Sequence, residues 1–397
     1  MKRAWAGLVG LLASGIGLAS APTSARDAQR VQRVTVGRGA GLATCEGIDS
    51  SNDNRARSDF PAAPQVSFRT RLAGGIGQAP VSDALGNLIV VHSEPRLSQL
   101  DAKGRTLWSE RLASEASSAP VLTSAGAILI VTRDGDVSLY SGAGKLQAKR
   151  GLPLSDPRRH TLTIPTDNGG ALIASGGELL ELDERGALVR KLHASGNLTT
   201  IAQANGELVA VSDNGTVQLA RATGELDRLG NFGGNVQDGA AVAAGRVFAI
   251  VDGHRWCALD MKTGRVETLG NDSNLSFTGP VALLDAPSAA LVVGGGFISM
   301  RGQDGSETAR VALNASTQGI EPATLRTFRP ALVVSDQRGA LAAVQGGTDA
   351  LVLRPGGDAL RLDDTSCLDP FRPTPTKNGI VLACRSGQLF GVSGTAP

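Results

Sequence analysis

A pattern of short apolar strands recurs about every forty residues along most of this chain. In its clearest copy, the apolar run Ile128–Val131 is followed by the turn Arg133-Asp134-Gly135-Asp136 and by the alternating run Val137–Tyr140. Apolar, β-branched runs separated by Asp-Gly are typical of paired strands in a hairpin. A regular repeat of this length predicts several copies of one structural unit, because a single unit is too small to bury its own apolar face.

Eight copies of the pattern align on the residue that opens each apolar pair. They begin near Pro80, Pro120, Pro165, Ile201, Gly239, Pro280, Pro322 and Pro373. Units of four short strands at this spacing are typical of a β-propeller, in which each blade covers the apolar face of its neighbour. An open all-β array or a pair of β-sandwiches is the alternative, but sandwiches lack so regular a period.

The last copy contains three strands, whereas residues 65–72 form a single alternating strand ahead of the first copy. Pairing of this N-terminal strand with the last copy would complete its fourth strand. We therefore expect an all-β fold, an eight-bladed β-propeller of four-stranded blades whose ring is closed by the N-terminal strand. The propeller would span residues 65–397, and a count of seven blades stays open.

The first residues have the composition of a secretory signal peptide. Met1-Lys2-Arg3 is basic, Ala6–Leu18 is apolar, and small residues follow. The apolar segment is shorter than the roughly 20 residues that a membrane-spanning helix needs. We predict a signal peptide over residues 1–25, cleaved after Ala25 in preference to Ala21. The mature chain would be periplasmic or secreted, without stable membrane insertion.

The segment between the signal peptide and the repeats, residues 26–64, has little periodicity. Its Gly, Pro, Asp and Asn residues favour turns and loops, and we expect an exposed linker or arm. No cysteine follows the apolar leader until Cys45, so the sequence does not predict a lipid anchor.

The charges of the chain are balanced and interspersed. The formal net charge is +2, from 39 basic and 37 acidic residues. This distribution gives no basic footprint for nucleic acid and does not itself select a partner. We expect a monomer whose partner is a protein or peptide in the envelope or outside the cell.

Four cysteines, Cys45, Cys257, Cys367 and Cys384, would reach an oxidising compartment. None has the CxxC spacing of a metal or redox site. Cys384 ends the second strand of the last unit, and Cys367 lies in the connection that enters it. These two segments lie on the same face of a propeller, so we predict a Cys367–Cys384 disulfide. Cys257 lies in a third strand and is expected to be a buried thiol.

The first unit contains the sequence LDAKGRTLW, residues 100–108. It resembles the LD-x-x-G-x-x-x-W consensus of the pyrroloquinoline-quinone-like (PQQ-like) propeller repeat family. Residues 258–264 and 182–186 carry parts of the same consensus. The resemblance implies that Asp101 and Gly104 form the turn between the third and fourth strands and that Trp108 packs between blades.

Quinone-dependent dehydrogenases of this superfamily use a series of docking Trp residues, a calcium carboxylate site and an aspartate base. After the predicted leader this chain has only Trp108 and Trp256, and it has no calcium loop of the D-x-[DN]-x-[DN]-G type. The better resemblance is to the non-catalytic branch, which includes the barrel-assembly propeller lipoprotein. It implies an exported binding scaffold without a cofactor. The alternative is a PQQ-dependent oxidoreductase, and carbohydrate binding is disfavoured by the single Tyr.

No catalytic motif was found, and the four histidines His92, His160, His193 and His254 are widely separated. We therefore predict neither a catalytic nor a metal site. In a propeller, the turns between second and third strands and the connections between blades share one face, which we call the turn-connection face. Its candidate binding residues are His92, Arg96, Arg133, Asp134, His254, Arg255, Arg338 and Arg385. Arginine there could hold a peptide carboxylate or backbone, although solvated turn charge is the simpler interpretation.

Overall fold

The structure, a computed structural model, consists of strands and turns in its described residues, without an α-helix among them. The chain divides into two units, residues 1–32 and 33–397, and every described residue lies in the second. The signal peptide predicted over residues 1–25 lies outside the described residues. These are 43, 45, 55–56 and 63–394, with gaps at 157, 159–160, 205, 221–223, 237–238, 272, 274–275, 278–280, 286–287, 294–296, 303–304, 313–330, 336–340, 345–349, 354–358, 368 and 378.

The described strands form eight sheets, seven with four strands and one with five. The first four sheets are antiparallel meanders: β3 (Val81–Ser82), β4 (Leu88–Val91), β5 (Arg96–Leu100) and β6 (Thr106–Arg111); β7 (Val121–Leu122), β8 (Ile128–Val131), β9 (Asp136–Tyr140) and β10 (Leu146–Gly151); β11 (Leu162–Pro165), β12 (Ala171–Ser175), β13 (Glu178–Leu182) and β14 (Leu188–His193); β15 (Leu198–Ala204), β16 (Glu207–Ser212), β17 (Thr216–Ala220) and β18 (Asp227–Asn231).

Of the remaining four sheets, two are again made of consecutive strands, and two each add a strand from the N-terminal part of the described chain. They are β19 (Ala240–Ala243), β20 (Arg246–Val251), β21 (Arg255–Asp260) and β22 (Val266–Asn271); β23 (Ala282–Asp285), β24 (Ser288–Val293), β25 (Phe297–Arg301) and β26 (Glu307–Ala312); β27 (Ala331–Ser335), β28 (Leu341–Val344), β29 (Leu351–Leu353) and β30 (Ala359–Arg361), with β1 (Arg55–Ala56); and β31 (Thr374–Thr376), β32 (Gly379–Ala383) and β33 (Gln388–Gly394), with β2 (Pro64–Arg71). The all-β, propeller-like arrangement predicted from the repeats is confirmed.

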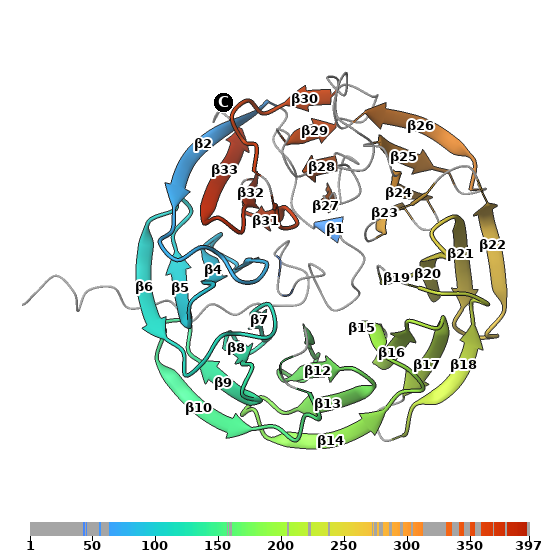
Figure 1. Cartoon of the computed structure of the whole chain (residues 1–397), viewed down its shortest axis with the longest axis horizontal. Coiled ribbons are helices and arrows are strands. Elements are labelled where there is room, and N and C mark those ends of the chain that lie inside the picture. Colours follow the sequence, from blue (N-terminus) through green and yellow to red (C-terminus); the bar gives the residue numbers. More distant parts are fainter. Residues whose placement is uncertain are drawn as a thin grey trace, which may run out of the picture. The chain divides into compact units, whose positions relative to one another are not determined.

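In the sheets whose side-chain burial is described throughout, burial falls from the second strand to the fourth. All four residues of β8 are buried, whereas most of β10 in the same sheet is exposed. Figure 1 shows the corresponding arrangement within the second unit, with the first strand of each sheet innermost and the fourth outermost. The core therefore lies between the inner strands of neighbouring sheets, which is why the second strands are continuous apolar runs. None of the described segments is a helix long and apolar enough to cross a membrane.

The turn from β5 to β6 contains the residues of the repeat motif. Asp101 Oδ1 accepts hydrogen bonds from the backbone amides of Lys103 and Arg105, both at 2.9 Å. Trp108 Nε1 donates to Gln99 Oε1 at 2.7 Å, and the indole ring covers Gly144 of the next sheet, where an added Cβ would lie 2.7 Å from the ring. Aspartate thus fixes the turn, and tryptophan packs between sheets, as the resemblance implied.

The strand β2 occupies the outer position of the last sheet. It pairs antiparallel with β33 from Pro64 opposite Gly394 to Arg71 opposite Gln388. Its Phe68 ring lies against Gly104 of the first sheet, where an added Cβ would lie 2.7 Å from the ring. This contact is equivalent to that of Trp108 with Gly144, so the last sheet packs against the first as the first packs against the second.

Part of the segment expected to be an exposed arm is buried instead. Ala43 is 2% exposed and Cys45 1% exposed. The Ser82 amide of β3 donates to the Ala43 carbonyl oxygen at 2.8 Å, and the Ala43 amide donates to Ser82 Oγ at 3.2 Å. The strand β1 pairs in parallel with β27. The inner strands have free edges with unpaired backbone groups, and this segment satisfies some of them, which local sequence pattern does not reveal.

Candidate functional site

In five of the described sheets, the turn between the second and third strands lies against the connection that enters the same sheet. An amide one or two residues after the second strand donates there to a carbonyl oxygen of this connection. The pairs are Ser93 to Gly75 at 3.4 Å, Arg133 to Glu115 at 2.8 Å, Asp213 to Asn197 at 2.8 Å, Asp252 to Asn235 at 2.9 Å and Arg385 to Asp369 at 2.9 Å. The turn-connection face is therefore built from repeated backbone contacts between these two kinds of segment.

Two predicted arginines on this face are exposed and form ion pairs near the surface. Arg133 Nη1 lies 2.7 Å from Glu115 Oε2, and the arginine side chain is 55% exposed. Arg96 Nε lies 3.9 Å from Glu94 Oε1, again with both side chains about half exposed. Asp134, next to Arg133, is exposed. Exposed pairs contribute little to stability, so these side chains could exchange their partners for those of a bound protein at small cost.

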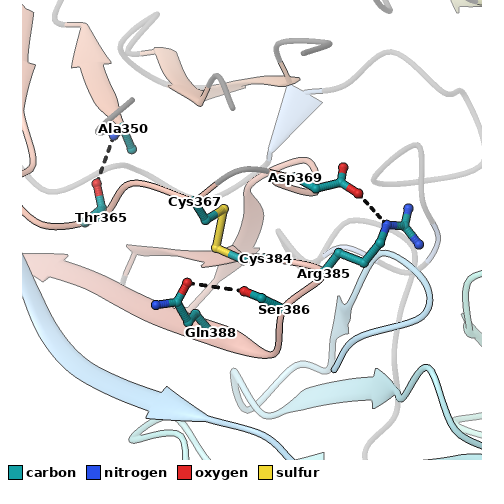
Figure 2. Close-up of a disulfide and its surroundings, with 8 residues drawn as sticks. All are labelled: Ala350, Thr365, Cys367, Asp369, Cys384, Arg385, Ser386 and Gln388. Carbon is teal, nitrogen blue, oxygen red and sulfur yellow. Dashed lines mark hydrogen bonds and ion pairs between the residues drawn. A yellow bond between two sulfur atoms is a disulfide. The ribbon is translucent and has the colours of Figure 1, made fainter. Parts of the chain in front are cut away.

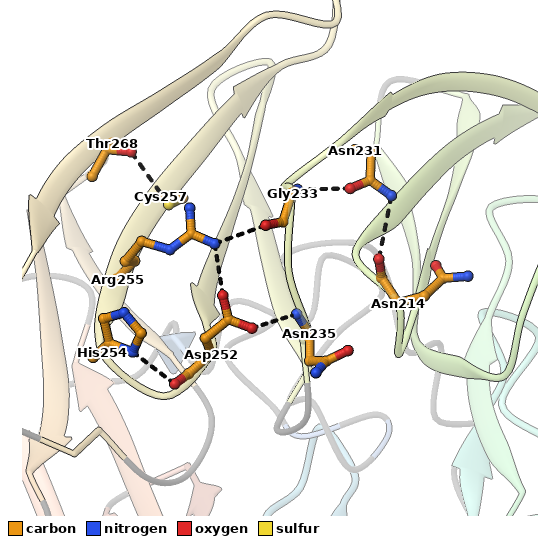
Figure 3. A network of polar contacts seen from close by, with 9 residues as sticks. All are labelled: Asn214, Asn231, Gly233, Asn235, Asp252, His254, Arg255, Cys257 and Thr268. Carbon is orange, nitrogen blue, oxygen red and sulfur yellow. Dashed lines mark hydrogen bonds and ion pairs between the residues drawn. The ribbon is translucent and has the colours of Figure 1, made fainter. Parts of the chain in front are cut away.

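Arg255 is part of a surface network of polar contacts that joins the fourth and fifth sheets (Figure 3). Its Nη2 donates to Asp252 Oδ2 at 2.8 Å and to the Gly233 carbonyl oxygen at 3.0 Å. The Asn235 amide donates to Asp252 Oδ1 at 2.8 Å. This amide, together with the guanidinium of Arg255, lowers the pKa of Asp252. Nδ1 of His254 lies 2.8 Å from the Asp252 carbonyl oxygen, so the network holds both predicted residues in place.

The disulfide between Cys367 and Cys384, the pair expected from the sequence, lies beside a fourth predicted arginine, Arg385 (Figure 2). The two Cα atoms are 6.0 Å apart. Arg385 Nε donates to Asp369 Oδ2 at 2.7 Å, and Nη1 donates to the Gly77 carbonyl oxygen at 3.2 Å. Its guanidinium lies 4.9 Å from the centre of the Phe371 ring. Arg385 therefore connects the last sheet to the segment that enters the first.

His92 lies beneath the surface of the turn-connection face, with only 6% of it exposed. Its Nδ1 is 3.2 Å from the Ala73 carbonyl oxygen, and its Nε2 is 2.9 Å from Ser98 Oγ. A carbonyl oxygen only accepts, so the neutral ring that bonds Ala73 carries its proton on Nδ1. His92 thus stabilises the passage from β2 into the first sheet and does not contact solvent as a binding residue would.

We expect acidification to destabilise the protein through His92. Burial lowers the pKa of His92, opposed in part by the hydrogen bond with Ala73. In the unfolded state the imidazole has its ordinary pKa of about 6.5, so below that pH the unfolded state binds more protons than the folded state does. The free energy of unfolding therefore falls as pH drops from about 6.5 towards the lower pKa of the folded state. Urea unfolding between pH 7.5 and about 5 would measure this loss, and His92→Gln should reduce it. An identical pH dependence in His92→Gln would contradict this assignment.

The eight predicted residues do not form one cluster. The seven that are described lie on four turns, His92 with Arg96, Arg133 with Asp134, His254 with Arg255, and Arg385 by itself, and Arg338 lies outside the described residues. Sequence reasoning missed the acidic partners Glu115, Asp252 and Asp369. Each of these acids could have been found from its place in the repeat. Asp252 lies in the same turn as Arg255, whereas Glu115 and Asp369 lie in the connections that enter the sheets of Arg133 and Arg385. Within the described residues, no group of three His, Cys, Asp or Glu side chains could hold a metal ion.

Cys257, a buried cysteine outside the disulfide, lies in surroundings that oppose thiol reactivity. Cys257 is 0% exposed, and its Sγ lies 3.8 Å from Thr268 Oγ1. Burial raises the pKa of its thiol, which opposes formation of the reactive thiolate. Cys257 therefore packs in the core of the fifth sheet, as its position in a third strand predicts.

Comparison with known proteins gives a sequence family and a fold. The family described as outer membrane protein assembly factor BamB matches residues 57–285. No curated protein sequence matches the chain. The crystal structure of BamB from Moraxella catarrhalis is similar, with 15% identity and a TM-score of 0.63 over 84% of this chain and 98% of that one. The computationally designed protein Ika8 is also similar, with 15% identity and a TM-score of 0.65 over 83% of this chain and 99% of that one.

The matched residues run from ahead of β2 to the end of β23, and they include the LDAKGRTLW motif with its Asp101 turn and its Trp108 contact. The match therefore covers more than half of the chain and the part in which the repeat is clearest. This chain belongs to the outer membrane protein assembly factor BamB family, in the BamB-like branch of the PQQ-like propeller repeats.

Proposed function

We propose that this protein is a non-catalytic scaffold that binds a protein or peptide partner during outer-membrane protein assembly. The observation that carries the proposal is the family match over residues 57–285, whose description is that of an assembly factor. A scaffold needs a surface complementary to its partner and does not need a cluster of reactive groups. The turn-connection face fits this requirement, because its arginines and acids are paired with one another. The match favours this function over a quinone-dependent oxidoreductase.

We further propose that the protein acts as an exported monomer in the periplasm. Residues 1–25 would be the signal peptide and residues 26–64 an arm that includes the buried Ala43 and Cys45. The disulfide supports an oxidising compartment, since such bonds persist there and are rare in the cytosol. The balanced net charge of +2 agrees with a partner that is recognised by local contacts and not by a strong overall field.

The architecture proposed for residues 65–397 is an eight-bladed ring closed by β2. Pairing of β2 with β33 supports it, as does the packing of Phe68 on Gly104. Two side-chain hydrogen bonds also join the last sheet to the first, from Thr374 Oγ1 to the Pro80 carbonyl oxygen and from Ser82 Oγ to the Pro375 carbonyl oxygen. A closed ring would present all of its second-to-third-strand turns on one face.

Partner binding should depend on the exposed arginine of the second sheet. The immobilised mature chain is incubated with envelope extract, and captured outer-membrane assembly components are quantified by mass spectrometry. We expect Arg133→Glu to reduce capture at least about fivefold, because charge reversal replaces attraction with repulsion at the interface. The substitution changes an exposed surface pair and should leave the fold intact.

Arg185→Glu provides the matched control for charge. Arg185 is 82% exposed and lies 4.0 Å from Glu184, in the turn between β13 and β14 and so away from the turn-connection face. Capture should be unchanged in this variant. Equal loss in Arg133→Glu and Arg185→Glu would indicate a general charge effect, and absence of any captured assembly component would refute the scaffold function.

A further inference from the structure

A cavity of about 650 Å³ lies between the last sheet and the first. It is bounded by turns that join first to second strands and third to fourth strands, a different set from those of the turn-connection face. The half-buried Phe68 and the half-exposed Leu85 present apolar surface to it, and the buried side chains of Leu88, Ile380, Val381 and Val392 lie beneath that surface. Its volume lies within the range of small-molecule sites, roughly 300–1,000 Å³.

The last sheet has a glycine beside the cavity, at a position where other sheets have side chains. Gly391 pairs with Phe68, and the same register position holds Gln99, Leu139 and Glu181 in the first three sheets. The Phe68 ring lies directly against this glycine, where an added Cβ would be 2.0 Å from the ring. The ring thus takes the place of the absent side chain, and both residues line the cavity.

The charge at this cavity has one sign. Lys103 and Lys377 line it, both are exposed, and no acidic side chain is among its lining residues. Across the described part of the chain, neither lysine has an ion pair with a carboxylate. The nearby Asp101 is instead paired with Arg105. Two ammonium groups at an apolar wall are complementary to an anion with an apolar body.

We propose that this cavity binds a small amphipathic carboxylate, with the carboxylate between Lys103 and Lys377 and the aliphatic body against Phe68 and Leu85. The site is separate from the partner-binding face and does not depend on the proposed assembly function. Binding would add a ligand at the junction where the N-terminal strand β2 and the C-terminal strand β33 meet the first sheet.

Octanoate is a suitable probe, and octylamine, with the same chain and opposite charge, is its control. Titration of the purified mature protein, followed by ligand-observed NMR, should show saturable binding of octanoate and none of octylamine. The double variant Lys103→Ala/Lys377→Ala should weaken octanoate binding about tenfold or more, since each charge-assisted contact contributes measurably to affinity. Ala102→Leu, which fills the rim of the cavity, should also weaken it.

Lys262→Ala is the matched control for the lysines. Lys262 is exposed and occupies an equivalent turn in the fifth sheet, where its amide bonds Asp260 Oδ1 at 3.1 Å as that of Lys103 bonds Asp101 Oδ1 at 2.9 Å. Octanoate affinity should be unchanged in Lys262→Ala. Lack of saturable binding to the wild-type protein, or equal affinity of the wild type and the double variant, would overturn the proposal.

Discussion

Reduction of the Cys367–Cys384 disulfide is expected to lower the free energy of unfolding by about 3 kcal/mol, because the bond restricts the unfolded chain by closing a loop. The sequence separation is 17 residues, and both cysteines are buried. The bond fixes the connection into the last sheet against the end of β32, beside the Arg385–Asp369 pair. Urea unfolding of the oxidised and reduced protein would measure the difference.

The double variant Cys367→Ala/Cys384→Ala separates loop closure from other effects of the reductant. Its midpoint of unfolding should be lower than that of the oxidised wild type and should not respond to reductant. Cys257 remains in this variant as a free thiol, which a reductant leaves unchanged, so any residual shift would measure effects of the reductant other than cleavage of the Cys367–Cys384 bond. A wild-type midpoint that is the same with and without reductant would show that the disulfide does not stabilise the folded chain.

The second large effect is expected for Gly264→Ala, which should destabilise the protein by about 3 kcal/mol. Gly264, in the turn from β21 to β22, has a φ of +70°. A side chain in this left-handed region costs roughly 1–2 kcal/mol. An added Cβ would also lie 2.3 Å from the carbonyl oxygen of Leu229 in the neighbouring sheet. Backbone cannot rotate away as a side chain can, so the sheets must separate at a further cost of about 1–3 kcal/mol.

Gly186→Ala isolates the backbone part of this cost. Gly186 lies in the equivalent turn of the third sheet with a φ of +71°, and an added Cβ there would meet nothing within 4 Å. We expect a loss of only about 1 kcal/mol, which reflects φ alone. Thermal or urea unfolding of both variants gives the comparison. If the two variants lose equal stability, the contact between Gly264 and Leu229 does not constrain the spacing of the sheets.

The strands were predictable because their signals are local. Continuous apolar runs such as Ile128–Val131 identify second strands, and an Asp-Gly pair marks the turn that follows. The Cys367–Cys384 pair was also accessible, since the repeat places the end of a second strand next to the connection that enters its sheet. These inferences need only the order of strands within one unit, which the repeat supplies.

Features that depend on contacts between distant segments were not predictable. Residues 26–64 lack periodicity, yet Ala43 and Cys45 are buried because they lie against strands far away in the sequence. The cavity beside Gly391 depends on the register of β2 with β33 and on the position of the Phe68 ring. His92 looked like an exposed turn residue, but the segment from β2 covers it through Ala73. Each case requires knowledge of which sheets are neighbours.

The pairing of β2 with β33 also bears on the order of events during folding. Ser67 Oγ donates to the Gly391 carbonyl oxygen across 324 positions of the chain. The strand β2 precedes the other strands of its sheet in the chain, and its partner β33 is the last described strand, so the hydrogen-bonding edge of β2 stays unsatisfied until β33 is present. Contacts of such long range form slowly, and unpaired edges promote aggregation. Unfolded chains of this protein should therefore need protection of β2 until β33 can pair with it.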